Sequence, residues 1–353
     1  MRRITAGIKA EIIDATSAGA AGNLSEAAIE KDQHVTDVLR ALATLCQSDI
    51  VHRQVFDKTM PATQEIMTRL IFAGGTCLSK AHRLIERMSE DIDIKIVLDP
   101  VPAGYALAKG KSDRARLTAL QRKVEHLLHE LGFSFVAAKG NPLTRDKHRY
   151  YCLRVAYHAE FHNISRALRP ELRLELIHRP PLLPADAQAI GYLLDSQINR
   201  PNPAQFPMAC ISIAETLAEK VLSLLRRCAW YWDGYQRGEF DTALVRHIYD
   251  VSQIVQQRPD MMAVARHIFG GIVSKDVEEF RGQHPEFDAT PYEVLRRTLE
   301  RAAIDTGLRE NYENRLKPLL FAANRPEFDV YFADFLDVAT RLLDHADPLP
   351  QAA

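Results

Sequence analysis

The stretch that decides the fold runs over Phe72–Ile96 and reads FAGGTCLSKAHRLIERMSEDIDIKI. An apolar strand stops at Gly74 and Gly75, a short helix is expected to follow, and the chain then alternates acids with isoleucines. Successive side chains of a strand point to opposite faces, so the carboxylates of Asp91 and Asp93 project together from one face. The isoleucines project from the other face, which predicts a half-buried strand.

Two carboxylates this close repel each other unless a positive charge lies near both, and a hard divalent cation with oxygen ligands meets that need. The glycine pair lets the backbone come close to a ligand, and free N–H groups at a helix start favour phosphate. Glycine turn, helix and paired acids follow in the order that metal-dependent phosphoryl transfer requires. The pattern therefore predicts Mg²⁺ at Asp91 and Asp93. The alternative is that both acids line the solvated face of an edge strand.

Composition excludes several classes of protein. The chain has 353 residues, of which 46% are hydrophobic and 26% charged, and its formal net charge is −1 at pH 7. These are the values of a folded soluble protein, and no apolar run approaches the roughly 20 residues of a bilayer span, so we expect no membrane association. The N-terminal residues do not resemble a secretory signal, and the five cysteines have no CxxC spacing. We therefore expect a cytoplasmic protein with reduced cysteines.

Hydrophobic periodicity divides the chain into two regions. An amphipathic helix with Ser25 as its N-cap precedes the opening stretch, and alternating strands dominate residues 133–177. Beyond about residue 206 nearly every periodic segment is helical. The sequence predicts an α+β domain with N-terminal helices and a mixed sheet over residues 1–205, followed by a helical domain over residues 206–353.

The opening stretch resembles the signature of the nucleotidyltransferase AbiEii/AbiGii toxin family, in which GGT, LSK and ER-x-SEDID follow one another. The residues that match are Gly74, Gly75, Thr76, Leu78, Ser79, Lys80, Glu86, Arg87, Ser89, Glu90, Asp91, Ile92 and Asp93. Met88 stands where an aromatic residue is common. The resemblance continues upstream in EKDQHVTDVLRAL and downstream in LRPELRLEL, AETLAEKVLSL and RHIYDV, over residues 30–251.

This resemblance implies the polymerase-β-like nucleotidyltransferase fold and the role of a MenT-like toxin in a type IV toxin–antitoxin or abortive-infection system. A nucleoside triphosphate would be the donor of a nucleotidyl group. An acceptor hydroxyl on RNA, with the 3′ end of tRNA as the candidate, would receive it. An antitoxin protein encoded nearby would be a further partner.

The resemblance also assigns roles to single residues. A third acid is expected from a neighbouring strand; Glu175 would complete the metal site or accept the proton of the attacking hydroxyl, with Glu171 as its rival on the same face. Lys220 would contact phosphate, and Asp250 would orient Lys220 or the substrate. An ordinary surface lysine and a hydrogen bond between helices are the alternatives for these two. The residues expected to line the triphosphate are Gly74, Gly75, Thr76, Ser79 and Lys80.

Between residues 139 and 179, nine lysines and arginines stand against four acids. This local excess suits the phosphates of an RNA acceptor, although a solvated surface of loops and strands would explain it equally well. Two other functions fit the same residues. One is a catalytically silent protein of this fold that binds nucleotide or RNA, and the other is a transferase that modifies a protein hydroxyl.

Overall fold

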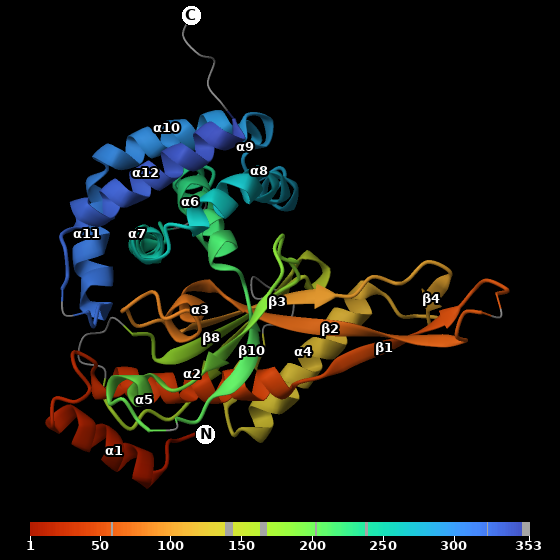
Figure 1. Cartoon of the computed structure of the whole chain (residues 1–353), viewed down its shortest axis with the longest axis horizontal. Helices are drawn as coiled ribbons and strands as arrows, with labels where there is room; N and C mark the ends of the chain where they lie inside the picture. Colours follow the sequence, from red (N-terminus) through yellow and green to blue (C-terminus); the bar gives the residue numbers. More distant parts are fainter. Residues whose placement is uncertain are drawn as a thin grey trace, which may run out of the picture. The chain divides into compact units, whose positions relative to one another are not determined.

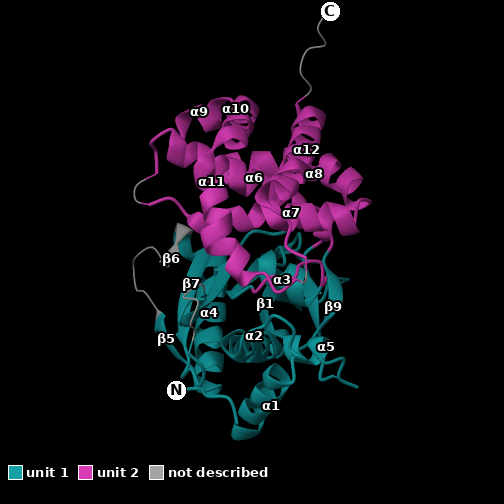
Figure 2. Ribbon diagram, turned by 90° about the vertical axis from the view of Figure 1, so that its left-hand side faces the viewer, with its two compact units in different colours: residues 1–81, 89–181, 185–211 teal, residues 82–88, 182–184, 212–353 magenta. Residues whose placement is uncertain are grey.

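A computed structural model describes residues 1–57, 59–137, 144–162, 168–201, 203–236, 239–322 and 324–347. The chain forms two compact units, coloured teal and magenta in Figure 2. The sheet unit comprises residues 1–81, 89–181 and 185–211. The helical unit comprises residues 82–88, 182–184 and 212–353, so two short segments leave the sheet unit and return to it.

The sheet unit combines helices with a mixed sheet. Its helices are α1 (Ala6–Ser17), α2 (Glu26–Thr44), α3 (Gly74–Lys80), α4 (Asp113–Glu130) and α5 (Leu193–Gln197), with a 3₁₀ turn at Asp146–His148. Its strands are β1 (Gln47–Arg53), β2 (Thr63–Ala73), β3 (Asp91–Leu98), β4 (Tyr105–Leu107), β5 (Ser134–Ala137), β6 (Thr144–Arg145), β7 (Tyr150–Ala156), β8 (Glu171–Ile177), β9 (Asp186–Ile190) and β10 (Phe206–Cys210). The predicted α+β class is confirmed.

In the described part of the chain the strands form one ten-stranded sheet in the order β4-β1-β2-β3-β8-β7-β5, with β10 beside β2 and β9, and β6 beside β7. The pairs β3–β8 and β10–β2 are parallel and the other pairs are antiparallel. Helices α2 and α4 lie against one face of this sheet (Figure 1). The three isoleucines of β3 and the three leucines of β8 are fully buried beneath them.

Local signals set several boundaries of the helices. The Ser25 hydroxyl accepts a hydrogen bond of 3.2 Å from the Ala28 N–H, so Ser25 is the predicted N-cap of α2. Helix α4 is followed by Gly132 at φ +80°, the left-handed conformation that glycine adopts without strain. The short helix expected after the glycine pair is α3. It ends at Lys80, because Arg83 adopts φ +56° and residues 82–88 join the helical unit.

The helical unit is built from α6 (Ile213–Trp232), α7 (Arg246–Gln257), α8 (Met261–Glu279), α9 (Pro285–Ala289), α10 (Pro291–Ile304), α11 (Thr306–Asn311) and α12 (Phe328–Ala346). Short 3₁₀ or π turns lie at Thr242–Val245, Tyr312–Leu316 and Lys317–Leu319. Among the described residues, no helix combines the length and the apolar character that a membrane crossing requires. Of the basic residues between 139 and 179, Lys139 and Arg166 lie outside the described residues.

Substitution of Ile94 tests the core that supports the acid strand. Ile94 is fully buried, so we expect Ile94→Ala to lower the free energy of unfolding by about 2–5 kcal/mol through lost burial and a cavity. Urea denaturation followed by circular dichroism measures the change. Ile50→Ala is the control, because Ile50 is 49% exposed on β1 and should cost little. Equal losses in the two variants would contradict this description of the core.

Candidate active site

The register of two adjacent strands brings three acids to one face of the sheet. Strand β3 pairs in parallel with β8, and Asp93 lies beside Glu175 while Asp91 lies beside Arg173. Neighbouring residues in such a register project from the same face. Asp91, Asp93 and Glu175 are half-buried on that face, opposite the fully buried isoleucines and leucines.

The same register separates the two candidates for the third acid. Glu171 pairs with Ala156 of β7, outside the stretch of β8 that pairs with β3, and its carboxylate lies 3.9 Å from the Arg154 guanidinium. Glu175 is the direct neighbour of Asp93, and its carboxylate lies 3.1 Å from Arg173. The geometry therefore favours Glu175 over Glu171 as the partner of the paired aspartates.

The carboxylate of Asp93 packs directly against the glycine turn. Gly74 has φ +75°, and a Cβ atom placed on it would lie 1.9 Å from Oδ2 and 2.8 Å from Cγ of Asp93. Two separate constraints therefore call for glycine at this position: the backbone conformation and the space that the carboxylate occupies. Helix α3 starts at Gly74 itself, so the turn and the acid strand form one local structure.

Buried polar contacts hold α3 to the start of β3 and to α2. The Thr76 hydroxyl hydrogen-bonds to the Ser89 hydroxyl at 2.9 Å and also donates to the backbone oxygen of Asp91. Lys80 is buried and forms an ion pair with Asp32 of α2. Its ammonium group is thus engaged within the sheet unit, whereas Ser79 is half-buried on the same helix.

Arg169 lies beside the first acid, although no role in the site was predicted for it. Its Nη1 lies 2.5 Å from Oδ1 of Asp91, and the two side chains are 35% and 26% exposed. Arg169 lies in the LRPELRLEL motif and in the basic stretch, but 78 residues separate it from Asp91, so its contact with that acid could not be predicted. The Arg169 guanidinium therefore balances the charge of Asp91.

The helical unit carries the other two predicted residues. Lys220 on α6 and Asp250 on α7 form an ion pair of 2.7 Å. Arg87 donates two further hydrogen bonds to the Asp250 carboxylate, both 2.7 Å long. Burial by itself would raise the pKa of Asp250, but the charges of Arg87 and Lys220 hold it well below its usual value. Asp250 is thus a buried carboxylate shared by two cations.

His247 closes this cluster on α7. Its Nδ1 lies 3.1 Å from the backbone oxygen of Lys220. Burial, together with the charge of Lys220, lowers the pKa of His247 to about 3, so its ring is neutral near pH 7. A neutral imidazole whose Nδ1–H donates to the carbonyl avoids a third cation beside Arg87 and Lys220.

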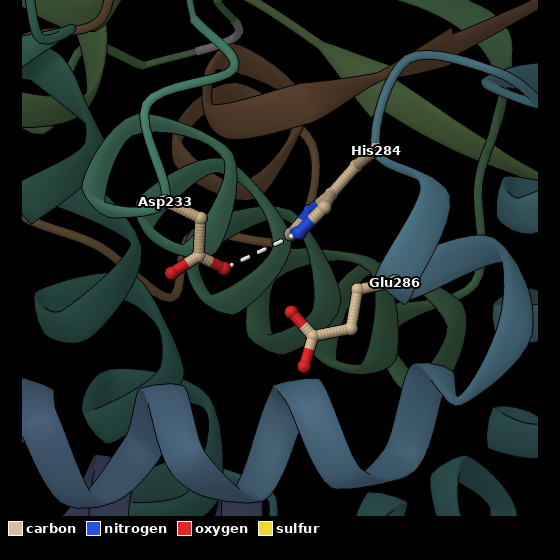
Figure 3. A group of neighbouring side chains, drawn as sticks. All are labelled: Asp233, His284 and Glu286. Carbon is tan, nitrogen blue, oxygen red and sulfur yellow. Dashed lines mark ion pairs between the residues drawn. The ribbon is translucent and has the colours of Figure 1, made fainter.

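Another group of side chains in the helical unit has donor atoms suited to a metal. Figure 3 shows the side chains of Asp233, His284 and Glu286 next to one another. Their ligand atoms lie within 4.8 Å of one another, and among the described residues this grouping occurs there and not at the three sheet acids. Arg297, however, lies 2.9 Å from the Asp233 carboxylate and 2.6 Å from that of Glu286. Because its guanidinium balances both acids, the group is an ion-pair network in this structure.

Comparisons with known proteins identify the family and the fold. A family model described as the nucleotidyl transferase AbiEii toxin of type IV toxin–antitoxin systems matches residues 62–334. Among solved structures, MenT4, a nucleotidyltransferase toxin from Mycobacterium tuberculosis H37Rv, is similar with a TM-score of 0.55 and 18% identity, covering 97% of this chain and 90% of that one. This likeness confirms the predicted nucleotidyltransferase fold. A search of curated proteins finds no match.

Removal of the Asp250 charge tests the buried cluster. We expect Asp250→Asn to lower the free energy of unfolding by about 3 kcal/mol or more, because Arg87 and Lys220 stay buried without a carboxylate. Since the pKa of Asp250 is lowered on folding, this stabilisation is fully present above the ordinary value of 3.8. The difference from the wild type should therefore hold from pH 8 to about pH 5 and shrink only at lower pH.

Urea denaturation at several pH values measures this difference. Asp260→Asn is the matched control, because Asp260 forms an ion pair with Arg258 on the surface of the same unit. We expect the control to leave the denaturation midpoint unchanged. A similar loss of unfolding free energy in both variants would show that the buried Asp250 cluster contributes no more stability than a surface ion pair.

Proposed function

The chain belongs to the family of AbiEii nucleotidyl transferase toxins of type IV toxin–antitoxin systems, and on this premise we propose that it transfers a nucleoside monophosphate from a nucleoside triphosphate to an RNA hydroxyl with the help of Mg²⁺. Its family makes it a nucleotidyltransferase, with a nucleoside triphosphate as substrate and an antitoxin as partner. The observation that carries the proposal is the packing of the Asp93 carboxylate on the glycine turn, with Glu175 beside it.

The donor set supports a hard divalent cation. Asp91, Asp93 and Glu175 would hold it through carboxylate oxygens, which Mg²⁺ prefers over nitrogen or sulfur ligands. When bound, the ion supplies charge neutralisation for the phosphates and for the acids themselves. The half-buried position of the three side chains leaves them access to solvent, which a nucleotide needs to reach them.

The residues of the glycine turn receive separate roles. We assign the triphosphate to Gly74, Gly75, Thr76 and Ser79, because these residues belong to α3, which begins directly beside the Asp93 carboxylate. The ion pair with Asp32 supports a different contribution for Lys80, which would fix α3 in place for phosphate binding. The 2.7 Å pair with Asp250 supports Lys220 as a phosphate contact whose ammonium Asp250 orients.

RNA as the acceptor, with the 3′ end of tRNA as the candidate, rests on the family and on the basic residues between 139 and 179. A cytoplasmic site of action follows from the same proposal, because the triphosphate donor and the RNA acceptor meet there. The first test is incubation of the purified protein with labelled nucleoside triphosphates, Mg²⁺ and total RNA. Label on RNA supports the proposal, label on polypeptide points to a protein hydroxyl, and no label points to a silent binding protein.

Asp93 is the residue on which this function depends most. We expect Asp93→Asn to lower the labelling rate at least about a hundredfold, because a divalent ion contributes several kcal/mol to such reactions. Its melting temperature should stay close to that of the wild type. Asp113→Asn, a substitution of an exposed acid at the start of α4, should label RNA normally. Normal labelling by Asp93→Asn would refute the metal assignment.

Gly74→Ala separates backbone strain from the contact with Asp93. Gly74 and Gly19 have φ values of +75° and +70°, so alanine costs about 1–2 kcal/mol of stability at either position. At Gly19 nothing lies within 4 Å of the added Cβ, whereas at Gly74 the Cβ displaces the Asp93 carboxylate. Gly74→Ala should therefore lose labelling and Gly19→Ala should keep it, at similar melting temperatures. Full activity of Gly74→Ala would show that the contact has no role.

A further inference from the structure

The backbone of Arg169 is held by buried side chains, although the Arg169 side chain itself is one-third exposed. Its backbone N–H donates a hydrogen bond of 2.9 Å to Oε2 of Glu90, and its backbone oxygen accepts one of 2.6 Å from Nζ of Lys31. Lys31 and Glu90 are themselves paired at 2.5 Å, with side chains 0% and 2% exposed. Both backbone groups of Arg169 are thus held by one buried ion pair.

Burying the charges of Lys31 and Glu90 costs desolvation free energy. Burial lowers the pKa of Lys31, and the charge of Glu90 opposes that effect, so the two groups stay together only because each compensates the other. Lys31 lies on α2, and Glu90 directly precedes Asp91. The pair therefore fixes the backbone of Arg169 relative to the first acid of the proposed metal site.

The guanidinium, in contrast to the backbone, is partly exposed and lies near two acids: Nη1 is 2.5 Å from Oδ1 of Asp91, and Nε is 3.9 Å from Oε1 of Glu90. It reaches Asp91 from a partly solvated position, where an ion pair contributes little free energy and a stronger ligand displaces it. A planar guanidinium is also well suited to phosphate oxygens, which it binds through two parallel hydrogen bonds. Arg169 thus combines a fixed backbone with a guanidinium that can exchange one anion for another.

We propose that Arg169 neutralises Asp91 while no divalent ion is bound, and that it turns to the triphosphate of the nucleotide when such an ion takes Asp91. This inference rests on the proposed function, because it requires the metal site at Asp91. It assigns to Arg169 two opposite effects: competition with the metal in the free protein and attraction of the triphosphate in the loaded one. A residue with a merely structural role would affect both in the same direction.

The test measures binding to the full chain by isothermal titration calorimetry, with Mn²⁺ alone and with inorganic triphosphate at saturating Mn²⁺. We expect Arg169→Gln to bind Mn²⁺ about two- to fivefold more tightly, as removal of a partly exposed ion pair implies. The same variant should bind triphosphate at least about fivefold more weakly, since a charged hydrogen-bond donor is lost. Arg169→Lys should shift both affinities in these directions by smaller factors, and it replaces the glutamine variant if that one does not fold.

Arg154→Gln is the matched control. Arg154 lies on β7, is 52% exposed and faces Glu171 at 3.9 Å, so its removal changes the net charge equally without touching Asp91. It should leave both affinities unchanged. Unchanged or weaker Mn²⁺ binding in Arg169→Gln, with binding still abolished by Asp91→Asn, would overturn this inference and leave the metal site intact. Absence of Mn²⁺ binding in the wild type and in both Arg169 variants would overturn the metal site as well.

Discussion

The crowding of carboxylates on one face of β3 and β8 is the constraint on which the rest of the structure depends. Asp91 and Asp93 share a strand face, and Glu175 lies beside Asp93 in the parallel register, so the sheet concentrates negative charge at one place. Such charges are tolerated only with positive partners. Arg169 at Asp91 and Arg173 at Glu175 supply them, and the missing Cβ of Gly74 leaves room for the Asp93 carboxylate.

Two buried ion pairs hold the elements that carry these acids. Lys80 joins α3 to Asp32 of α2, and Lys31 of α2 joins the loop before β8 to Glu90. Removing one partner of a buried pair is far more costly than the net contribution of the pair, so such contacts define one arrangement rather than adding much stability. Two neighbouring residues of α2 therefore hold both elements: Asp32 holds α3, and Lys31 holds the residue that precedes β3. This explains why charged residues are buried on a helix whose other role is to cover the hydrophobic face of the sheet.

Local pattern predicted what local physics determines. The alternation of acids and isoleucines identified β3 and its two faces, Ser25 identified the start of α2, and the glycine pair identified the turn. The ion-pair partners of the charged residues could not be predicted in this way, because they lie far apart along the chain and no local pattern connects them. Asp32 and Lys80 are 48 residues apart, and Arg87 and Asp250 are 163 apart. The resemblance to a family marked Lys80 and Arg87 as part of a motif, but their ion pairs show what those positions do.

The motif over residues 74–93 is divided between the two units, because its middle segment, residues 82–88, belongs to the helical unit. The glycine helix and the acid strand belong to the sheet unit, whereas Arg87 belongs to the helical unit and pairs with Asp250, which also holds Lys220. The Glu86 backbone N–H donates to the Tyr249 hydroxyl, and the Met88 N–H donates to the Leu319 backbone oxygen, so both ends of this stretch are held in the helical unit. Only Met88 and two further residues separate Arg87 from Asp91 along the chain. The motif that the resemblance identified therefore carries, within a few residues of chain, both an ion-pair partner of Asp250 and the first acid of the sheet unit.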